Sequence, residues 1–159
     1  MTTDRDTARL LDALVGLVTV WTDARVQSRI AAAVGLPLDP TAIRAVYLIG
    51  ARGGSLGSTA LAEHGGLTRP TASKLVTRLE ELGLATRERS GRSVEVALTP
   101  AGSSAYAALV EAGTAMVRRA VPDWSAQETT QFADQAQRFL AALSHTTAAP
   151  AATPTKEKP

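Results

Sequence analysis

The sequence has no cysteine in its 159 residues and only two histidines, His64 and His145. Without cysteine the chain has no disulfide, no thiolate metal site and no thiol-based peroxide sensor. The two histidines are too far apart in sequence to give a metal-ligand spacing. The sequence also lacks a G-x-S-x-G elbow, a phosphate-binding loop and an H-E-x-x-H motif. We therefore expect neither an enzyme nor a protein that carries a metal or another cofactor.

Aromatic residues are scarce at 4%, whereas hydrophobic residues reach 45%, a proportion typical of globular proteins. The core must then consist mainly of leucine, valine and alanine, which favours a mostly α fold. No stretch approaches the ~18 apolar residues that a membrane span requires, and the N-terminus lacks a signal-peptide pattern. We expect a cytoplasmic protein without a membrane partner.

Charge is modest, since the net charge is +2 and the sequence pI is 9.4. Such a weak excess does not by itself indicate a nucleic-acid partner. Its distribution is more informative, because no acidic residue lies between Leu67 and Leu79. The basic residues of this region and of the segment after it are Arg69, Lys74, Arg78, Arg87, Arg89 and Arg92.

Residues 68–82 have the pattern of an amphipathic helix. Thr68 is placed to cap it, and Pro70 falls in its first turn, where a missing N–H costs nothing. One apolar stripe recurs at helical spacing and consists of Ala72, Leu75, Val76 and Leu79. The other face carries Arg69, Thr71, Ser73, Lys74, Thr77 and Arg78. Basic and hydroxyl side chains bind phosphates and base edges, although an ordinary surface helix has a similar pattern.

A short helix is predicted just before it, from Thr59 to His64, with Ser58 as its cap. Gly65 and Gly66 end this helix, because glycine enters left-handed conformations without a steric penalty. Two helices joined by so tight a turn form a helix-turn-helix, which sets the second helix in a DNA groove.

A β-hairpin is predicted after Gly83, with strands over residues 84–89 and 93–98 and a turn at Ser90–Gly91. Residues 55–57 are expected to add a short third strand. Arginines gather toward the tip at Arg87, Arg89 and Arg92. Such a hairpin is a wing that can contact a DNA backbone or minor groove, whereas the alternative is a solvated turn.

This order of elements resembles the winged-helix core of the MarR family of bacterial transcriptional regulators. The matching residues are Leu61, Ala62, Leu67, the run 71–79, Glu80, the run 82–84, Arg87, Arg92 and the run 98–102. Two positions depart from the family pattern: Ser90 stands in place of the wing aspartate, and Gly65 in place of an apolar residue.

The resemblance implies a winged helix-turn-helix that binds double-stranded DNA through the 68–82 helix and the 87–93 wing. It also implies a dimeric regulator, a repressor of an inverted-repeat operator, which a small-molecule effector releases. The DNA-binding residues would be Ser58, Thr68, Arg69, Thr71, Ser73, Lys74, Thr77, Arg78, Arg87, Arg89 and Arg92. The alternative is a winged helix that binds an acidic protein partner and no specific DNA. A remote third option is a helical small-molecule-binding protein.

Helices with apolar stripes are predicted on both sides of this core. One long helix is expected over residues 7–34 and another over 40–51, the latter with Ile43, Val46 and Tyr47 inward. Further helices follow over residues 100–121 and after a capping box at residues 125–128. The domains would be an N-terminal dimerisation helix (1–36), the DNA-binding domain (37–100), C-terminal dimerisation helices (101–145) and a disordered tail (146–159).

Apolar stripes at the two ends of the chain predict a homodimer, since a lone subunit would leave them partly exposed. The alternative is that they pack on each other within one chain. A small aromatic or anionic effector could bind between the DNA-binding and dimerisation regions. Trp21, Arg25 and Tyr47 would then offer a ring, a cation and a hydroxyl. Alternatively, the two rings anchor the core and Arg25 is solvated.

Overall fold

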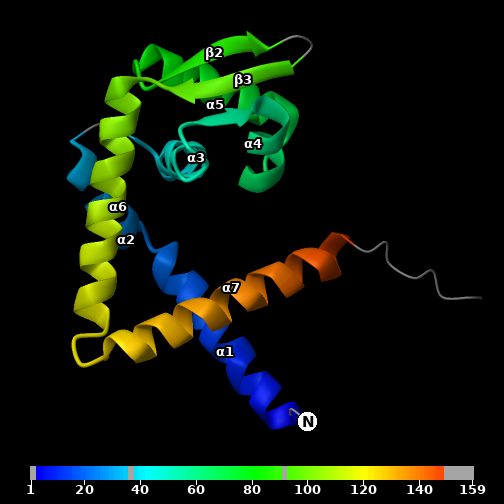
Figure 1. The fold of residues 1–159 in the computed structure, drawn as a ribbon, viewed down its shortest axis with the longest axis vertical. Coiled ribbons are helices and arrows are strands. Elements are labelled where there is room, and N and C mark those ends of the chain that lie inside the picture. The colour runs from blue at the N-terminus through cyan, green and yellow to red at the C-terminus, as the bar shows by residue number, and fades with distance from the viewer. Residues whose placement is uncertain (1–2, 36–37, 91–92, 149–159) are drawn as a thin grey trace, which may run out of the picture. The chain divides into compact units, whose positions relative to one another are not determined.

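The computed structural model describes residues 3–35, 38–90 and 93–148. The chain divides into two compact units, Met1–Val117 and Arg118–Pro159. The elements, drawn in Figure 1, follow in the order α1 (Asp4–Trp21), α2 (Ala24–Val34), α3 (Pro40–Gly50), β1 (Ser55–Gly57), α4 (Ser58–Gly65), α5 (Arg69–Glu81), β2 (Ala85–Ser90), β3 (Ser93–Leu98), α6 (Pro100–Ala120) and α7 (Ala126–Ala148). The predicted class, mostly α with a small β wing, is confirmed.

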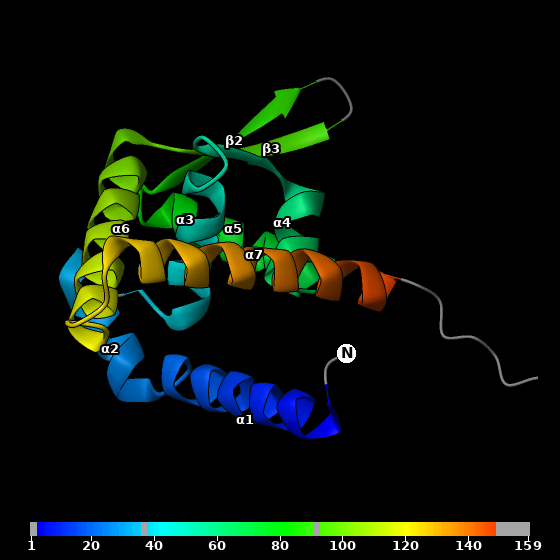
Figure 2. The ribbon, with the colours of Figure 1, turned by 60° about the horizontal axis from the view of Figure 1, so that its bottom comes forward.

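The first unit contains the winged-helix domain, in which α3, α4 and α5 pack beside a three-stranded antiparallel sheet of order β1-β3-β2. Figure 2 shows the β2–β3 hairpin, the wing, projecting beyond these helices. The largest fully buried side chains come from α3, α4, α5, β3 and the segment between α5 and β2. They are Val46, Ile49, Leu61, Val76, Leu79, Leu84 and Val96. No polar side chain of the described residues is buried with them. Burial of apolar surface thus holds the domain together.

The turn between α4 and α5 sets the angle of the second helix. Gly66 has φ 64° and closes α4 in the left-handed conformation, while the Leu67 N–H donates to the Ala62 carbonyl over 2.8 Å. The buried Gly65 leaves room that the Leu67 side chain fills, since a Cβ there would lie 3.1 Å from Leu67 Cδ1. The predicted cap at Ser58 is wrong: Gly57 is the N-cap and Ser58 is the first helical residue.

The wing is a regular hairpin in which β2 and β3 pair from Ala85 opposite Leu98 to Ser90 opposite Ser93. Ser90, predicted to lie in the turn, is instead a strand residue that pairs with Ser93. Gly91 and Arg92 lie outside the described residues. The predicted third strand is confirmed, since Leu56 of β1 pairs with Val96 of β3.

Helix α6 leaves the sheet through Thr99, whose hydroxyl donates to the Gly83 carbonyl and accepts from the Gly102 N–H. Gly102 is buried, and a Cβ at this position would overlap the Leu84 carbonyl. Gly50 in α3 likewise lies directly beneath the ring of Tyr106. Both glycines are therefore needed for α6 to approach its neighbours this closely.

The prediction of a single helix over residues 7–34 is wrong. Helix α1 ends at Trp21, and α2 begins at Ala24 with Asp23 as its N-cap. The Asp23 carboxylate accepts from the Arg25 N–H over 2.8 Å and caps α2. The Gln27 side-chain amide donates to the Trp21 carbonyl over 2.7 Å, and the Thr22 hydroxyl donates to the Val18 carbonyl. Polar side chains thus bond to the last carbonyls of α1, and the Thr22 hydroxyl does so beside the backbone bond from Thr22 N–H to Val18.

Tyr47 is not the core residue that the sequence predicted. It is 49% exposed, and its ring packs edge-on against Tyr106 with centroids 5.7 Å apart. The preceding residues Ile43 and Val46 are buried as expected. Tyr47 follows Val46 directly, about 100° further around the helix, and so lies at the edge of the buried stripe.

The second unit consists of the end of α6 and the helix α7. The capping box at its start is confirmed: Ser125 and Glu128 exchange side-chain-to-backbone hydrogen bonds of 2.8 Å and 3.2 Å. Just before and after it, the Trp124 and Phe132 rings stack edge-on at 5.4 Å. The helix continues to Ala148, three residues into the predicted tail. Residues 149–159 lie outside the described part of the chain.

Candidate nucleic-acid interface

The recognition helix, α5, exposes a basic and hydroxyl-rich face. The Thr68 hydroxyl accepts from the Thr71 N–H over 3.3 Å and caps it, with Pro70 in the first turn, as predicted. The stripe Ala72, Leu75, Val76 and Leu79 is buried, which confirms the predicted orientation of the helix. The side chains predicted to face outward are all exposed, namely Arg69, Thr71, Ser73, Lys74, Thr77 and Arg78. A rod with this face fits a DNA major groove.

One flank of α5 lies against the wing and is closed by a guanidinium. Arg87 of β2 donates to the Ser73 carbonyl over 2.8 Å and to the Thr77 hydroxyl over 2.9 Å. The same guanidinium pairs with the carboxylate of Glu80, which also accepts the Arg87 backbone N–H over 3.1 Å. Arg87, predicted to reach DNA from the wing tip, is thus held at the base of the wing.

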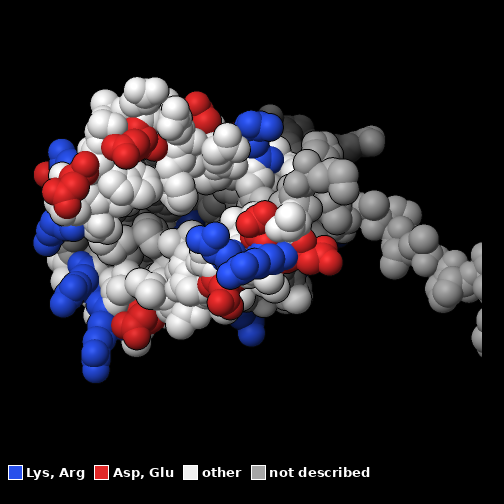
Figure 3. Space-filling model, turned by 90° about the horizontal axis from the view of Figure 1, so that it is seen from below, with Lys and Arg blue, Asp and Glu red and all other residues white. Residues whose placement is uncertain are grey.

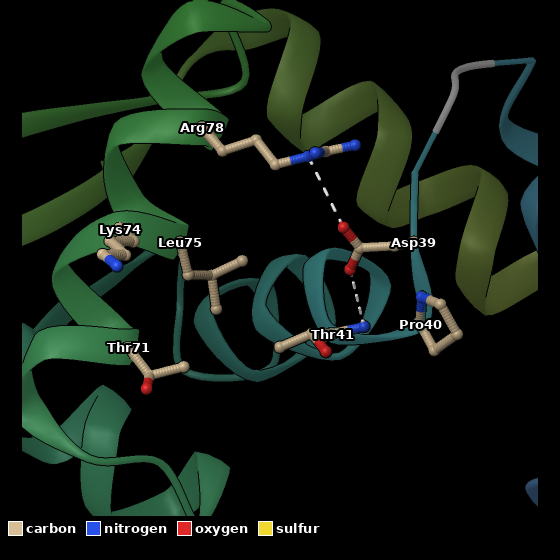
Figure 4. Close-up of a pocket in the computed structure, with 7 residues that line it drawn as sticks. All are labelled: Asp39, Pro40, Thr41, Thr71, Lys74, Leu75 and Arg78. Carbon is tan, nitrogen blue, oxygen red and sulfur yellow. Dashed lines mark hydrogen bonds and ion pairs between the residues drawn. The ribbon is translucent and has the colours of Figure 1, made fainter.

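The other flank of α5 faces the start of α3 and is open. Figure 4 shows this shallow pocket of about 370 Å³, which is lined by Asp39, Pro40, Thr41, Thr71, Lys74, Leu75 and Arg78. Asp39 caps α3 by accepting from the Thr41 and Ala42 N–H groups, both over 2.9 Å. Its other carboxylate oxygen lies 3.5 Å from Nε of Arg78. One acid therefore joins the α3 cap to the recognition helix.

The pairing register gives the wing two different faces. Arg87 pairs with Val96 and Arg89 with Val94, so both arginines lie on the face that carries the buried Val96. Glu88 pairs with Glu95 on the opposite face, where the Ser55 hydroxyl donates to Glu95 over 2.9 Å. Only the arginine face can approach a phosphate backbone without repulsion from this acidic pair.

Two residues predicted to bind DNA, Ser58 and Arg92, do not belong to the exposed face of α5. Ser58 is half-buried at the start of α4, and Arg92 lies outside the described residues.

The sequence did not predict Asp39 and Glu80, the acids that pair with Arg78 and Arg87. Each lies on a different element from its arginine, and helical or strand periodicity gives no signal for contacts of that kind. Figure 3 shows a different face, viewed from below the orientation of Figure 1, on which acidic and basic side chains are interspersed.

The predicted effector residues lie on three different helices: Trp21 ends α1, Arg25 begins α2 and Tyr47 is in α3. All three are exposed. Among the described residues the ring contact of Tyr47 is with Tyr106 and not with Trp21. Their role stays a prediction.

A sequence profile of the MarR family matches residues 36–93, which span α3 to the wing. This segment carries the buried stripe, the exposed basic face and both arginine–carboxylate pairs described above. In this region the chain is similar to the MarR family. Regulators of the MarR family are DNA-binding transcription factors and not enzymes. No curated protein sequence matches the chain.

Solved MarR-family structures resemble the chain beyond the winged helix. A MarR family protein from Bacillus stearothermophilus is 20% identical, with a TM-score of 0.73 over 91% of this chain and 99% of its own. A MarR family transcriptional regulator from Silicibacter pomeroyi is 25% identical, with a TM-score of 0.64 over 87% of this chain and 90% of its own. NadR, solved with 4-hydroxyphenylacetate, is 21% identical, with a TM-score of 0.63 over 83% of this chain and 89% of its own.

Proposed function

We propose that this chain is a dimeric transcriptional regulator that binds double-stranded DNA, a repressor that a small-molecule effector releases. The observation that carries the proposal is the exposed face of α5, with Arg69, Lys74 and its hydroxyl groups, next to the arginine face of the wing. Basic side chains release counterions from phosphates, and arginine, serine and threonine can also read base edges. In this proposal α5 enters the major groove, and Arg89 of the wing lies along the backbone.

The dimer is proposed from the terminal helices. The apolar stripe of α1 is exposed, with Leu10 at 50%, Leu17 at 53% and Val18 at 61%, and α1 buries no residue. In α7, Phe132 is 58% and Leu140 60% exposed. Apolar faces of this size are stabilised by a partner surface, and a second copy of the chain supplies one. A two-fold dimer would set two recognition helices about one DNA turn, ~34 Å, apart, so the operator would be an inverted repeat.

The effector is proposed as a small aromatic acid. NadR, a protein of the same fold, is solved with 4-hydroxyphenylacetate. Exposed Trp21, Arg25 and Tyr47 could offer this chain a ring, a cation and a hydroxyl for such a molecule. The effector must prefer the dimer whose recognition helices are wrongly spaced for DNA, because a ligand indifferent to both states shifts no equilibrium.

A gel-shift titration with the DNA upstream of its own reading frame tests the regulator proposal. We expect binding that is tighter than to random DNA at moderate salt. Replacing Lys74 with alanine should weaken binding and lower the salt slope by about one, because one phosphate contact is lost. The matched control is Arg138→Ala, which removes an exposed positive charge from α7. Affinity equal to that for random DNA would exclude a sequence-specific regulator.

The alternative function, a winged helix that binds protein, makes the opposite prediction for DNA. It draws support from the modest net charge of +2, which gives the chain only a weak overall basic character. A protein-binding module would leave no footprint on DNA, yet the Lys74 variant would still lose affinity for an acidic partner in a salt-dependent manner.

A further inference from the structure

Arg87 makes more polar contacts to the recognition helix than any other described residue of the wing. Its guanidinium contacts the Ser73 carbonyl, the Thr77 hydroxyl and the Glu80 carboxylate, and its backbone N–H donates to Glu80 as well. All three partners lie on the side of α5 that faces β2. One strand residue therefore spans two successive turns of the helix.

Three of the five guanidinium N–H donors are engaged, one on Nη1 and two on Nη2. Arginine presents its donors in a rigid planar fork, and a fork bound on both arms holds one orientation. The side chains of Arg87 and Glu80 are 35% and 31% exposed, so water has limited access to the pair. A DNA phosphate that bound the engaged arms of Arg87 would compete with Glu80, Ser73 and Thr77 for the same donors.

We propose that Arg87 is a positioning residue that locks the base of the wing to the recognition helix, and that it does not contact DNA itself. The side chain that the described part of the wing presents to the backbone is then Arg89, which lies on the same face of β2. Glu80 is the second half of the lock. This inference rests on the proposed DNA-binding function, because it assigns a role within the same surface.

The two roles predict opposite effects for Glu80→Gln, a change that keeps the shape of the side chain and removes its charge. If Arg87 positions the wing, loss of the pair loosens the hairpin and DNA binding weakens. If Arg87 binds a phosphate, loss of its acidic competitor frees it and binding tightens. Removing any acid near DNA also reduces repulsion, so the comparison is made with Glu81→Gln, the exposed neighbouring residue outside this network.

We expect Glu80→Gln to bind the operator about five- to tenfold more weakly than Glu81→Gln, a coupling typical of residues in one ion-pair network. Arg87→Lys should weaken binding to a similar extent, because lysine keeps the charge and loses the planar fork. Equal or tighter binding by Glu80→Gln, or wild-type affinity in Arg87→Lys, overturns the positioning role.

A measurement without DNA separates this inference from the function on which it rests. Amide hydrogen exchange in Arg87→Lys should accelerate in β2 and β3, while the amides of α3 keep their protection and report an intact core. Wild-type exchange in the wing overturns the lock. If the unmodified chain fails to bind DNA, the regulator proposal fails, and the exchange result still decides whether Arg87 fixes the wing.

Discussion

The winged-helix core and the terminal helices place their apolar side chains in opposite environments. Val46, Leu61 and Leu79 are fully buried in the core. By contrast, Leu11 of α1 is 62% exposed and Leu140 of α7 is 60% exposed. The core therefore obtains its stability from its own packing. The terminal helices still need a surface to cover them, so they and not the core are expected to respond to protein concentration.

Placing a charge on the α1 stripe should have the largest effect. Leu17→Glu would remove one apolar contact from each subunit and leave two carboxylates in the proposed interface. At ~1.5–3 kcal/mol for each buried leucine, the dimer should lose about 3–6 kcal/mol. Sedimentation velocity should then find monomers at concentrations where the unmodified chain is dimeric. The control is Thr19→Glu, on the opposite side of the helix. A dimer that survives Leu17→Glu excludes α1 as its interface.

Within the core, Leu79→Ala should cost about 2–5 kcal/mol in the free energy of unfolding, because it leaves a cavity at a fully buried site. Denaturant titration followed by circular dichroism measures this loss. Leu79→Met preserves most of the volume and should cost less than about 1.5 kcal/mol. If both variants unfold like the unmodified chain, the core is not as closely packed as the burial of Leu79 indicates.

Two glycines of α6 offer a finer comparison within one helix. Gly102→Ala would force a methyl group into the Leu84 carbonyl and should destabilise the chain by roughly 1–3 kcal/mol. Gly113→Ala meets no atom within 4 Å and should stabilise the helix by up to about 1 kcal/mol. Thermal unfolding of both variants tests the pair. The same sign for both would mean that α6 does not approach Leu84 as closely as Gly102 indicates.

Local pattern predicts the winged-helix region well because its signals are carried by neighbouring residues. The spacing of Leu75, Val76 and Leu79 fixed the buried face of α5, and the alternation in β3 indicated the wing. The break between α1 and α2 was missed because it depends on single hydrogen bonds from Thr22 and Gln27, which leave the hydrophobic pattern unchanged.

The candidate site was predicted less completely than the fold. Residue type and periodicity placed Arg69 and Lys74 on the exposed face of α5, where the structure has them. The same reasoning treated Arg87 as free to bind DNA, although Glu80 pairs with it seven residues away on another element. Partners of charged side chains are set by tertiary packing, which one-dimensional patterns do not encode.

Asp39 connects the core to the open flank of α5 and should give a smaller effect. Asp39→Asn keeps the α3 cap, since asparagine caps helices as well as aspartate does, and removes the ion pair with Arg78. Because both side chains are about half exposed, the stability lost should be ~0–1 kcal/mol. Asp39→Ala removes the cap as well and should cost about 1 kcal/mol more. Equal unfolding midpoints for the two variants would show that the cap contributes nothing.

The smallest effect concerns Glu128 at the start of α7, where no core is available and a local cap orders the helix. Hydrogen bonds from the side chain and backbone of Ser125 hold the pKa of Glu128 below its ordinary value of 4.5. A lowered folded-state pKa contributes stability that is present above the unfolded pKa and is lost as pH falls through the folded value. The first turn of α7 should therefore fray in acid, with backbone amide shifts of residues 126–129 as the probe. In Ser125→Ala the carboxyl should titrate closer to 4.5, whereas Ser104→Ala in α6 should leave it unchanged. If Glu128 has the same pKa in Ser125→Ala as in the unmodified chain, the capping box does not hold this turn in solution.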